Sequence, residues 1–158
     1  MSVYSLIIDH FVTDLTATVP KLAHVVVHRY APQDASALMD DDAKHLAIWP
    51  LGERPAEVAG VFTMSGIDAA IDIQVLYWES AHGEAERGLV DEAAAGEMFE
   101  LIDDVRARFL SNANRSAVGS YNTRWLDVTL GMGGTQGSSL VRWFIATVRA
   151  NVPIPYSP

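Results

Sequence analysis

Apolar side chains recur at helical spacing in two stretches of the chain. Residues 3–19 predict an amphipathic helix, with Ser2 or Ser5 as its cap and Pro20 after its end. Its apolar stripe consists of Val3, Ile7, Ile8, Phe11, Leu15 and Val19. Residues 89–110 predict a second helix, with acids in its first turn and arginines in its last turn, as the helix dipole favours. The apolar stripe of this helix consists of Ala94, Met98, Leu101, Ile102, Val105 and Phe109.

Between the two helices the pattern changes to that of strands. Residues 22–30 are dense in β-branched side chains and predict a strand. A short second strand is expected at residues 45–49, where Pro50 ends it, and residues 51–57 are expected to form a loop. Residues 58–78 predict either two strands that turn at Ser65-Gly66 or one long bent strand. Within it, apolar and polar positions alternate in a way typical of a strand with one buried face.

The last part of the chain reads as a β-hairpin. From Tyr121 to Val152, two runs of β-branched and aromatic residues flank the segment GMGGTQGSS at Gly131–Ser139. Glycine and serine favour turns, so this segment is predicted to be a mobile tip. Helix, strands, helix and hairpin in this order predict a single α+β domain over residues 1–158, with an antiparallel or mixed sheet and both helices on one face.

Composition supports a globular protein and limits its partners. The chain has 158 residues, of which 49% are hydrophobic and 20% charged. Residues 1–110 carry 7 basic and 19 acidic side chains, whereas residues 111–158 carry four arginines and only Asp127. The acidic body argues against nucleic-acid binding. Its basic end could meet an acidic surface, on another protein or on a second copy, although the acids could also serve solubility alone.

The sequence lacks the features of disulfide-bonded, membrane-spanning and secreted proteins, so we expect none of these three classes. It has no cysteine, so disulfides and thiolate metal sites are excluded and a reducing cytosol is expected. No apolar run approaches the length of about 20 residues that spans a bilayer. The N-terminus has no basic segment of the kind that begins a signal peptide.

Candidate catalytic motifs do not match their templates. The segment Gly131–Ser139 lacks the lysine of a phosphate-binding loop and is followed by a strand where a helix should begin. No serine lies in a G-x-S-x-G motif. His24 and His28 lie four residues apart but have no further metal ligands at a recognisable spacing. His82 lies among glutamates and residues 40–42 are three aspartates, yet both segments resemble solvated loops. We therefore expect no enzyme activity, cofactor or metal.

The four tryptophans lie in or at the ends of predicted strands. Core packing is the first explanation for them, and a protein interface is the second.

The layout of these elements resembles the tail terminator family of long-tailed bacteriophages, also called minor tail protein U or tail completion protein. The resemblance spans nearly the whole chain. It rests on the N-terminal helix SLIIDHFVTDL, the strand IDIQVLYWE, the helix DEAAAGEMFELIDDVRARF and the last strand RWFIATVRANVPI after a glycine-rich loop.

The resemblance implies a structural protein of the virion. Such proteins form a hexameric ring on the head-proximal end of the tail tube, stop its polymerisation and offer a surface that joins the head. The expected partners are a second copy, the tail tube protein and the head–tail connector, with DNA only passing through the lumen. The family has no catalytic residues to carry over. The protein would be made in the host cytoplasm and end in the virion tail.

Candidate contact residues come from the hairpin and the tryptophans. They are Met132, Thr135, Gln136, Ser138, Arg124, Arg142, Arg149, Trp49 and Trp78. Two alternatives stay open: a head–tail connector or completion protein, and a small cytosolic enzyme or ligand-binding domain. A deep pocket with converging polar groups and shifted pKa values would favour the last.

Overall fold

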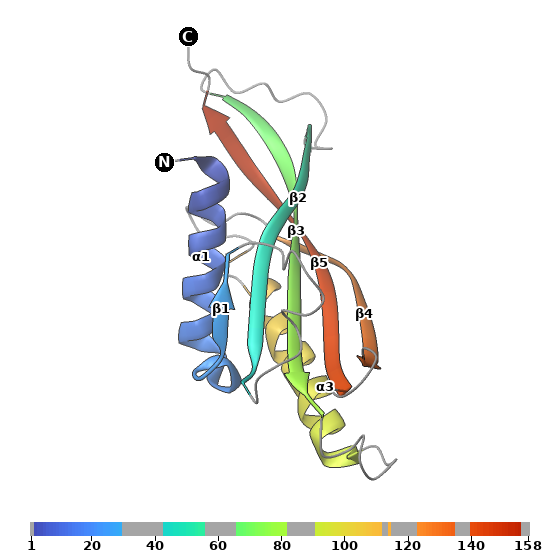
Figure 1. Ribbon diagram of the computed structural model, residues 1–158. Helices are drawn as coiled ribbons and strands as arrows, with labels where there is room; N and C mark the ends of the chain where they lie inside the picture. Colours follow the sequence, from blue (N-terminus) through green and yellow to red (C-terminus); the bar gives the residue numbers. More distant parts are fainter. Residues whose placement is uncertain are drawn as a thin grey trace.

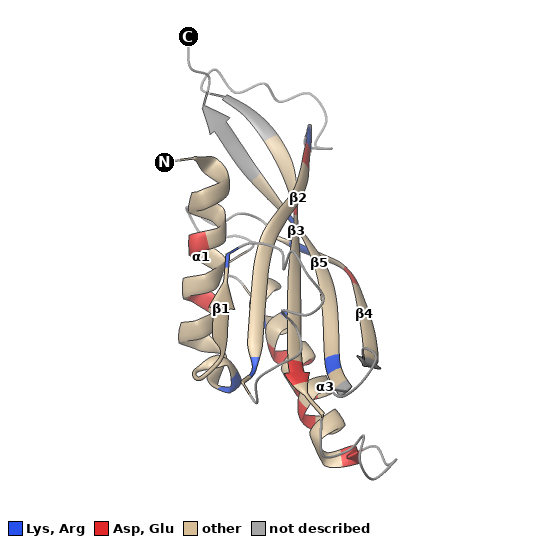
Figure 2. Cartoon of the chain, in the orientation of Figure 1, with Lys and Arg blue, Asp and Glu red and all other residues tan. Residues whose placement is uncertain are grey.

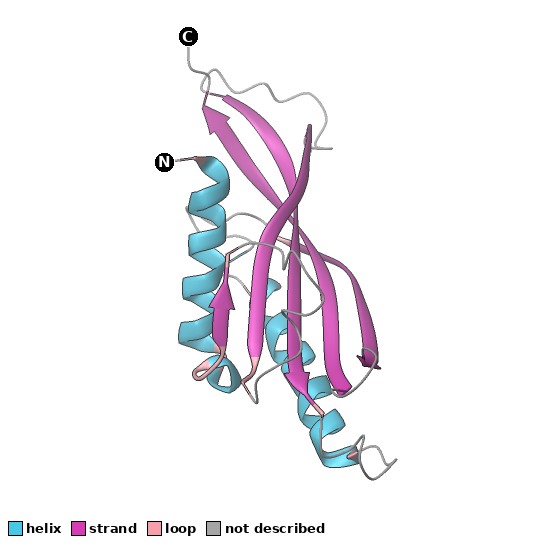
Figure 3. Ribbon diagram, viewed as in Figure 1, coloured by secondary structure: helices cyan, strands magenta, loops and turns pink. Residues whose placement is uncertain are grey.

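The computed structural model describes residues 2–29, 43–55, 66–81, 91–111, 114, 123–134 and 140–155. In these residues two long helices pack against one side of a twisted five-stranded sheet, as Figures 1 and 3 show. The predicted α+β class, with both helices on one face of the sheet, is therefore confirmed.

Both long helices begin at a polar cap that the sequence supplies. Helix α1 spans Val3–Thr18, and the Ser2 hydroxyl accepts a hydrogen bond of 3.1 Å from the Ser5 amide. Pro20 does not continue this helix but opens a single 3₁₀ turn, η1, at Pro20–Leu22. Helix α3 spans Glu92–Phe109 and is capped by Asp91, which accepts from the amides of the next turn. Both helices agree with the predictions to within a few residues.

The five strands form a mixed sheet in the order β1-β2-β3-β5-β4. They are β1 (Val26–His28), β2 (His45–Pro55), β3 (Gly66–Ser80), β4 (Arg124–Gly134) and β5 (Leu140–Pro155). Only β1 and β2 are parallel, and the three other pairs are antiparallel. Strands β3 and β5 pair over their full described length, from Gly66–Pro155 to Ser80–Val141, and so form the centre of the sheet.

Two strand predictions between the helices need correction. The strand expected at residues 22–30 is only Val26–His28, because Leu22 ends η1 and residues 23–24 form a turn before the strand. The strand expected to end at Pro50 continues to Pro55. Its register with β3 shifts between Pro50 and Gly52, and such a bulge accommodates a proline that has no amide to donate. Residues 51–55, expected to form a loop, therefore belong to β2.

The long strand and the hairpin are found where the pattern placed them. Strand β3 is one continuous strand from Gly66, and residues 58–65, the first part of the predicted segment, lie outside the described residues. Strands β4 and β5 pair antiparallel, but β4 continues through Gly134, which pairs with Leu140. The predicted nine-residue tip was thus too long at its start. Its remainder, residues 135–139, lies outside the described residues.

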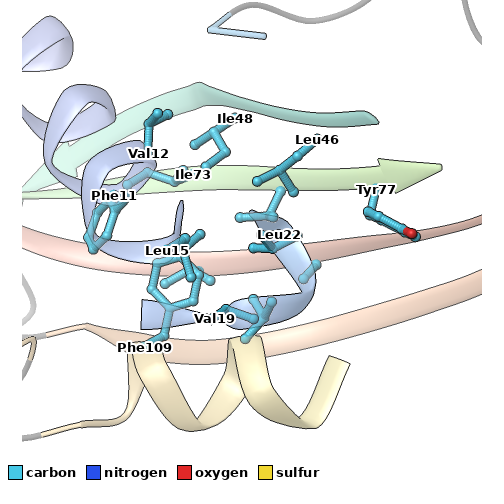
Figure 4. Packing of buried hydrophobic residues seen from close by; sticks show 14 of the residues in the cluster. Phe11, Val12, Leu15, Val19, Leu22, Leu46, Ile48, Ile73, Tyr77 and Phe109 are labelled. Atoms are coloured by element: carbon cyan, nitrogen blue, oxygen red, sulfur yellow. The ribbon is translucent and has the colours of Figure 1, made fainter. Parts of the chain in front are cut away.

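The hydrophobic core lies between the helices and the sheet (Figure 4). Fully buried side chains from α1, such as Phe11 and Leu15, meet Ile48 and Ile73 of the sheet and Phe109 of α3. We call this side of the sheet the helix face and the opposite side the outer face. Since each strand residue points to the side opposite to its neighbours, the register assigns every described strand position to one of the two faces.

A second, smaller apolar cluster lies on the outer face. Its buried members are Ala47, Leu76, Trp78 and Val141, with Trp49, Trp143 and Ile145 packed against them. Three of the four tryptophans are therefore on the outer face, and only Trp125 packs on the main core.

Candidate functional site

Strand β4 forms one edge of the sheet and presents large apolar side chains to solvent. On the edge that faces away from β5, it pairs with no strand of the described segments. Leu126, Leu130 and Met132 are 41%, 47% and 39% exposed. Soluble proteins usually protect such an edge with charges, proline or a covering element, because it can pair with another chain. We call Leu126, Leu130 and Met132 the β4 edge patch.

The local sequence explains why β4 holds this position. Trp125 packs against Phe109 of α3 at a ring distance of 6.2 Å, and the Arg106 guanidinium lies 5.3 Å from the Trp125 ring. A register shift between Trp125 and Asp127 leaves Leu126 without a partner in β5. The core thus fixes the start of β4, while the bulge directs an apolar side chain toward solvent.

The structure brings two of the predicted contact residues, Arg124 and Met132, to this edge. Both are exposed. Thr135, Gln136 and Ser138 lie outside the described residues. Leu126 and Leu130, which complete the β4 edge patch, were not among the predicted residues. Their spacing of two residues, which Val128 and Met132 share, was the signal in the sequence that could have found them.

Arg142 is buried in an ion pair and is not available at the surface. Its guanidinium is 2% exposed and donates to the Glu79 carboxylate at 2.9 Å. The Tyr77 hydroxyl donates to the other oxygen of Glu79 at 2.6 Å. Burial and this carboxylate raise the pKa of Tyr77, so its hydroxyl stays protonated. The ion pair joins the end of β3 to the start of β5, and this structural role explains Arg142.

Arg149 joins a cluster of charges on the outer face. It donates to Asp72 through Nε at 2.7 Å and Nη2 at 3.2 Å, and Arg54 donates to the same carboxylate at 2.5 Å. The bonds from Arg149 hold the pKa of Asp72 below its usual range, and Arg54 adds to this effect against the opposing effect of burial. In the next strand, Arg124 lies directly opposite Arg149. We call Arg54, Arg149 and Arg124 the basic row.

Trp78 and Trp49 lie on the outer face, away from the β4 edge. Trp78 is 3% exposed and stacks on His45 and His28, whose rings are joined by a hydrogen bond of 3.1 Å. Trp49 is half-buried beside this cluster. Core packing therefore accounts for Trp78. No group of three or more potential metal ligands occurs among the described residues.

A cavity of about 360 Å³ lies between α3, η1 and the ends of β2 and β3. It is lined by Lys21, Lys44, Tyr77, Glu79, Glu97, Met98, Glu100 and Leu101. Lys21 pairs with Glu100 at 2.8 Å, and Lys44 lies 3.7 Å from Glu79. Four of its charged side chains thus pair with one another. The cavity is the feature that a ligand-binding function would use, but its paired charges do not single out a ligand.

A polar network that sequence analysis missed joins α1 to the end of α3. Asp14 accepts two bonds from Arg108, one of them from Nε at 2.6 Å, and a third from Asn114 at 3.1 Å. The Asn114 side chain also contacts His10 Nε2 at 3.0 Å. Burial alone would raise the pKa of Asp14, but the bonds from Arg108 and Asn114 outweigh burial and lower it. The network fastens the two helices to each other.

Comparisons with known proteins do not identify the chain. No protein-family model matches the sequence. No curated protein matches it either. None of the described helices is long and apolar enough to cross a membrane.

Proposed function

We propose that this protein is a structural assembly protein of a phage tail. In this proposal it acts as a tail terminator: a ring of copies caps the head-proximal end of the tail tube, stops tube polymerisation and offers the surface that joins the head. The protein itself contributes binding surfaces and no chemistry.

The observation that carries the proposal is the β4 edge patch. An eleven-residue edge strand with three exposed apolar side chains is suited to contact another protein chain. The strand belongs to an α+β domain with two helices on one face, and this is the layout on which the resemblance to tail terminators rests. Assembly gives a reason for the edge, because a contact with a neighbouring chain removes these side chains from water.

A small ligand-binding domain is the alternative that a specific observation favours. Its site would be the cavity beside Tyr77, whose pKa is raised by burial and by Glu79. We favour assembly because four charged side chains around the cavity pair within the chain, whereas no described residue covers the β4 edge patch in this way.

The proposal is tested by adding the purified protein to polymerising tail tubes and measuring tube length by electron microscopy. We expect rings at one end of each tube and an arrest of elongation. A head–tail connector would instead bind finished tubes that already carry a terminator. Tubes that elongate unchanged, with no density at their ends, would refute a terminator function.

A further inference from the structure

The basic row places positive charges next to each other, and this lowers the stability of the fold unless negative charges lie nearby. Arg124 and Arg149 are cross-strand partners, and like charges in this position repel each other. Asp72 pairs with Arg54 and Arg149, whereas Arg124 pairs with no acid among the described residues, of which Asp127 is the acid on the same face of β4. A surplus of positive charge remains. The Arg54 side chain is 52% exposed and Arg124 is also exposed, so the surplus faces solvent.

The solvent side of α3 carries the opposite charge. Its exposed acids are Glu92, Glu97, Glu100, Asp103 and Asp104. Figure 2 shows acidic positions at intervals along α3. Lys21 pairs with Glu100 and Asp104, and Arg106 pairs with Asp103. Two bases therefore face five acids, and a surplus of negative charge remains. We call this surface the acidic face of α3.

Both surfaces also expose apolar side chains that a contact would cover. The β4 edge patch begins two residues after Arg124. On α3, Phe99 is 53% exposed among the acids, and Leu110, the residue at the C-cap of α3, is 39% exposed. Apolar side chains surrounded by charges of complementary sign are the composition expected of a specific protein contact, in which burial gives affinity and charge gives orientation.

We propose that the basic row and the β4 edge patch of one copy bind the acidic face of α3 on the next copy. The basic row lies on the outer face, whereas Leu130 and Met132 pair with Phe144 and Arg142 and point to the helix face, so this binding surface continues around the edge of β4. It differs from the acidic face of α3, so the contact is heterologous and each copy keeps one surface of each kind free for a further neighbour. Repetition of such a contact closes a ring or extends a filament. The inference rests on the proposed function, because it names the contact between copies that the ring requires.

Charge reversal on each surface tests the contact. One variant carries Arg124→Glu, and a second carries Glu97→Lys together with Asp103→Lys. In each variant alone, the two surfaces repel each other, and we expect self-association to weaken by about tenfold or more. In an equal mixture, every contact again joins opposite charges, so assembly should return to the level of the unmodified protein. The readout is the mass in solution by light scattering over a range of concentrations.

A control variant with Arg29→Glu makes the same charge change at another exposed site, where Arg29 pairs with Asp9. It should assemble normally. Normal assembly of Arg124→Glu, or a mixture that stays dissociated, would overturn the proposed contact.

The same samples separate this inference from the proposed function. A mixture that regains assembly but leaves tube elongation unchanged would support the contact and contradict the terminator function. Single variants that fail to self-associate but still cap tubes would show that capping does not use this contact.

Discussion

At the residue scale, Gly131 is required by the ring of Trp143. The two residues are cross-strand partners in the hairpin. A β-carbon at Gly131 would lie 2.7 Å from Cη2 of Trp143 and still closer to two other ring atoms. We expect Gly131→Ala to lower the free energy of unfolding by about 1–3 kcal/mol, because the ring must move out of its packing. Urea unfolding followed by tryptophan fluorescence measures this change.

Gly96 supplies the matched control for this substitution. It lies inside α3, and a β-carbon there meets no atom within 4 Å. Gly96→Ala should raise the free energy of unfolding by about 0.5–1 kcal/mol, because alanine is the better helix former. Equal effects of the two substitutions would contradict the contact between Gly131 and Trp143.

Two carboxylates should make the stability of the protein depend on pH in the acid range. The pKa values of Asp14 and Asp72 are below their ordinary value of 3.8. Their contribution to stability is therefore complete above pH 3.8 and is lost as the pH falls below it, where the unfolded chain binds protons first. We expect Asp14→Asn to reduce stability at pH 6 and to flatten its decline between about pH 4 and pH 2. Urea midpoints over this pH range are the measurement, and an unchanged slope would contradict the role of the Arg108 bond.

The pairs that create these carboxylate sites could not be found from sequence. Asp14 and Arg108 are 94 positions apart, and Glu79 and Arg142 are 63 apart. No local pattern links such positions, because the fold alone decides which distant side chains meet. The basic C-terminal region illustrates the consequence: its arginines were predicted to face a partner, yet Arg142 and Arg149 pair with carboxylates of β3.

At the scale of elements, the spacing of apolar residues predicted the helices and strands that bury one side against the core. Both helices and the alternating part of β3 were found because one side of each faces the core. The end of β2 was missed because Pro50 normally stops a strand, whereas here a bulge beside it lets the strand continue. The length of β1 was overestimated because β-branched residues can also lie in a turn that leads into a strand.

The β4 edge patch leads to a prediction about this element. Leu130→Ser removes an exposed apolar side chain, so the free energy of unfolding should change by less than about 0.5 kcal/mol. Self-association should nevertheless weaken, because the contact loses apolar area. Leu51→Ser is the control, since Leu51 is 51% exposed at the bulge of β2, which β3 and β5 separate from β4. A loss of association in the control as large as that of Leu130→Ser would show that the β4 edge has no special role.

At the scale of the whole molecule, the fold arranges charge more finely than the sequence suggested. The sequence divides into an acidic body and a basic end, but two arginines of the basic end form ion pairs with acids of the body within the sheet. What remains is the basic row on the outer face and the acidic face of α3. Two different, complementary surfaces on one chain are what a closed ring of identical copies needs.

The mass of the purified protein in solution, with electron microscopy of the same sample, tests this account most directly. We expect a concentration-dependent assembly near six times the chain mass of 17.2 kDa, with ring-shaped particles, which dissociates as salt screens the contact. A mass of 17.2 kDa at every concentration, with and without tail tubes, would contradict it.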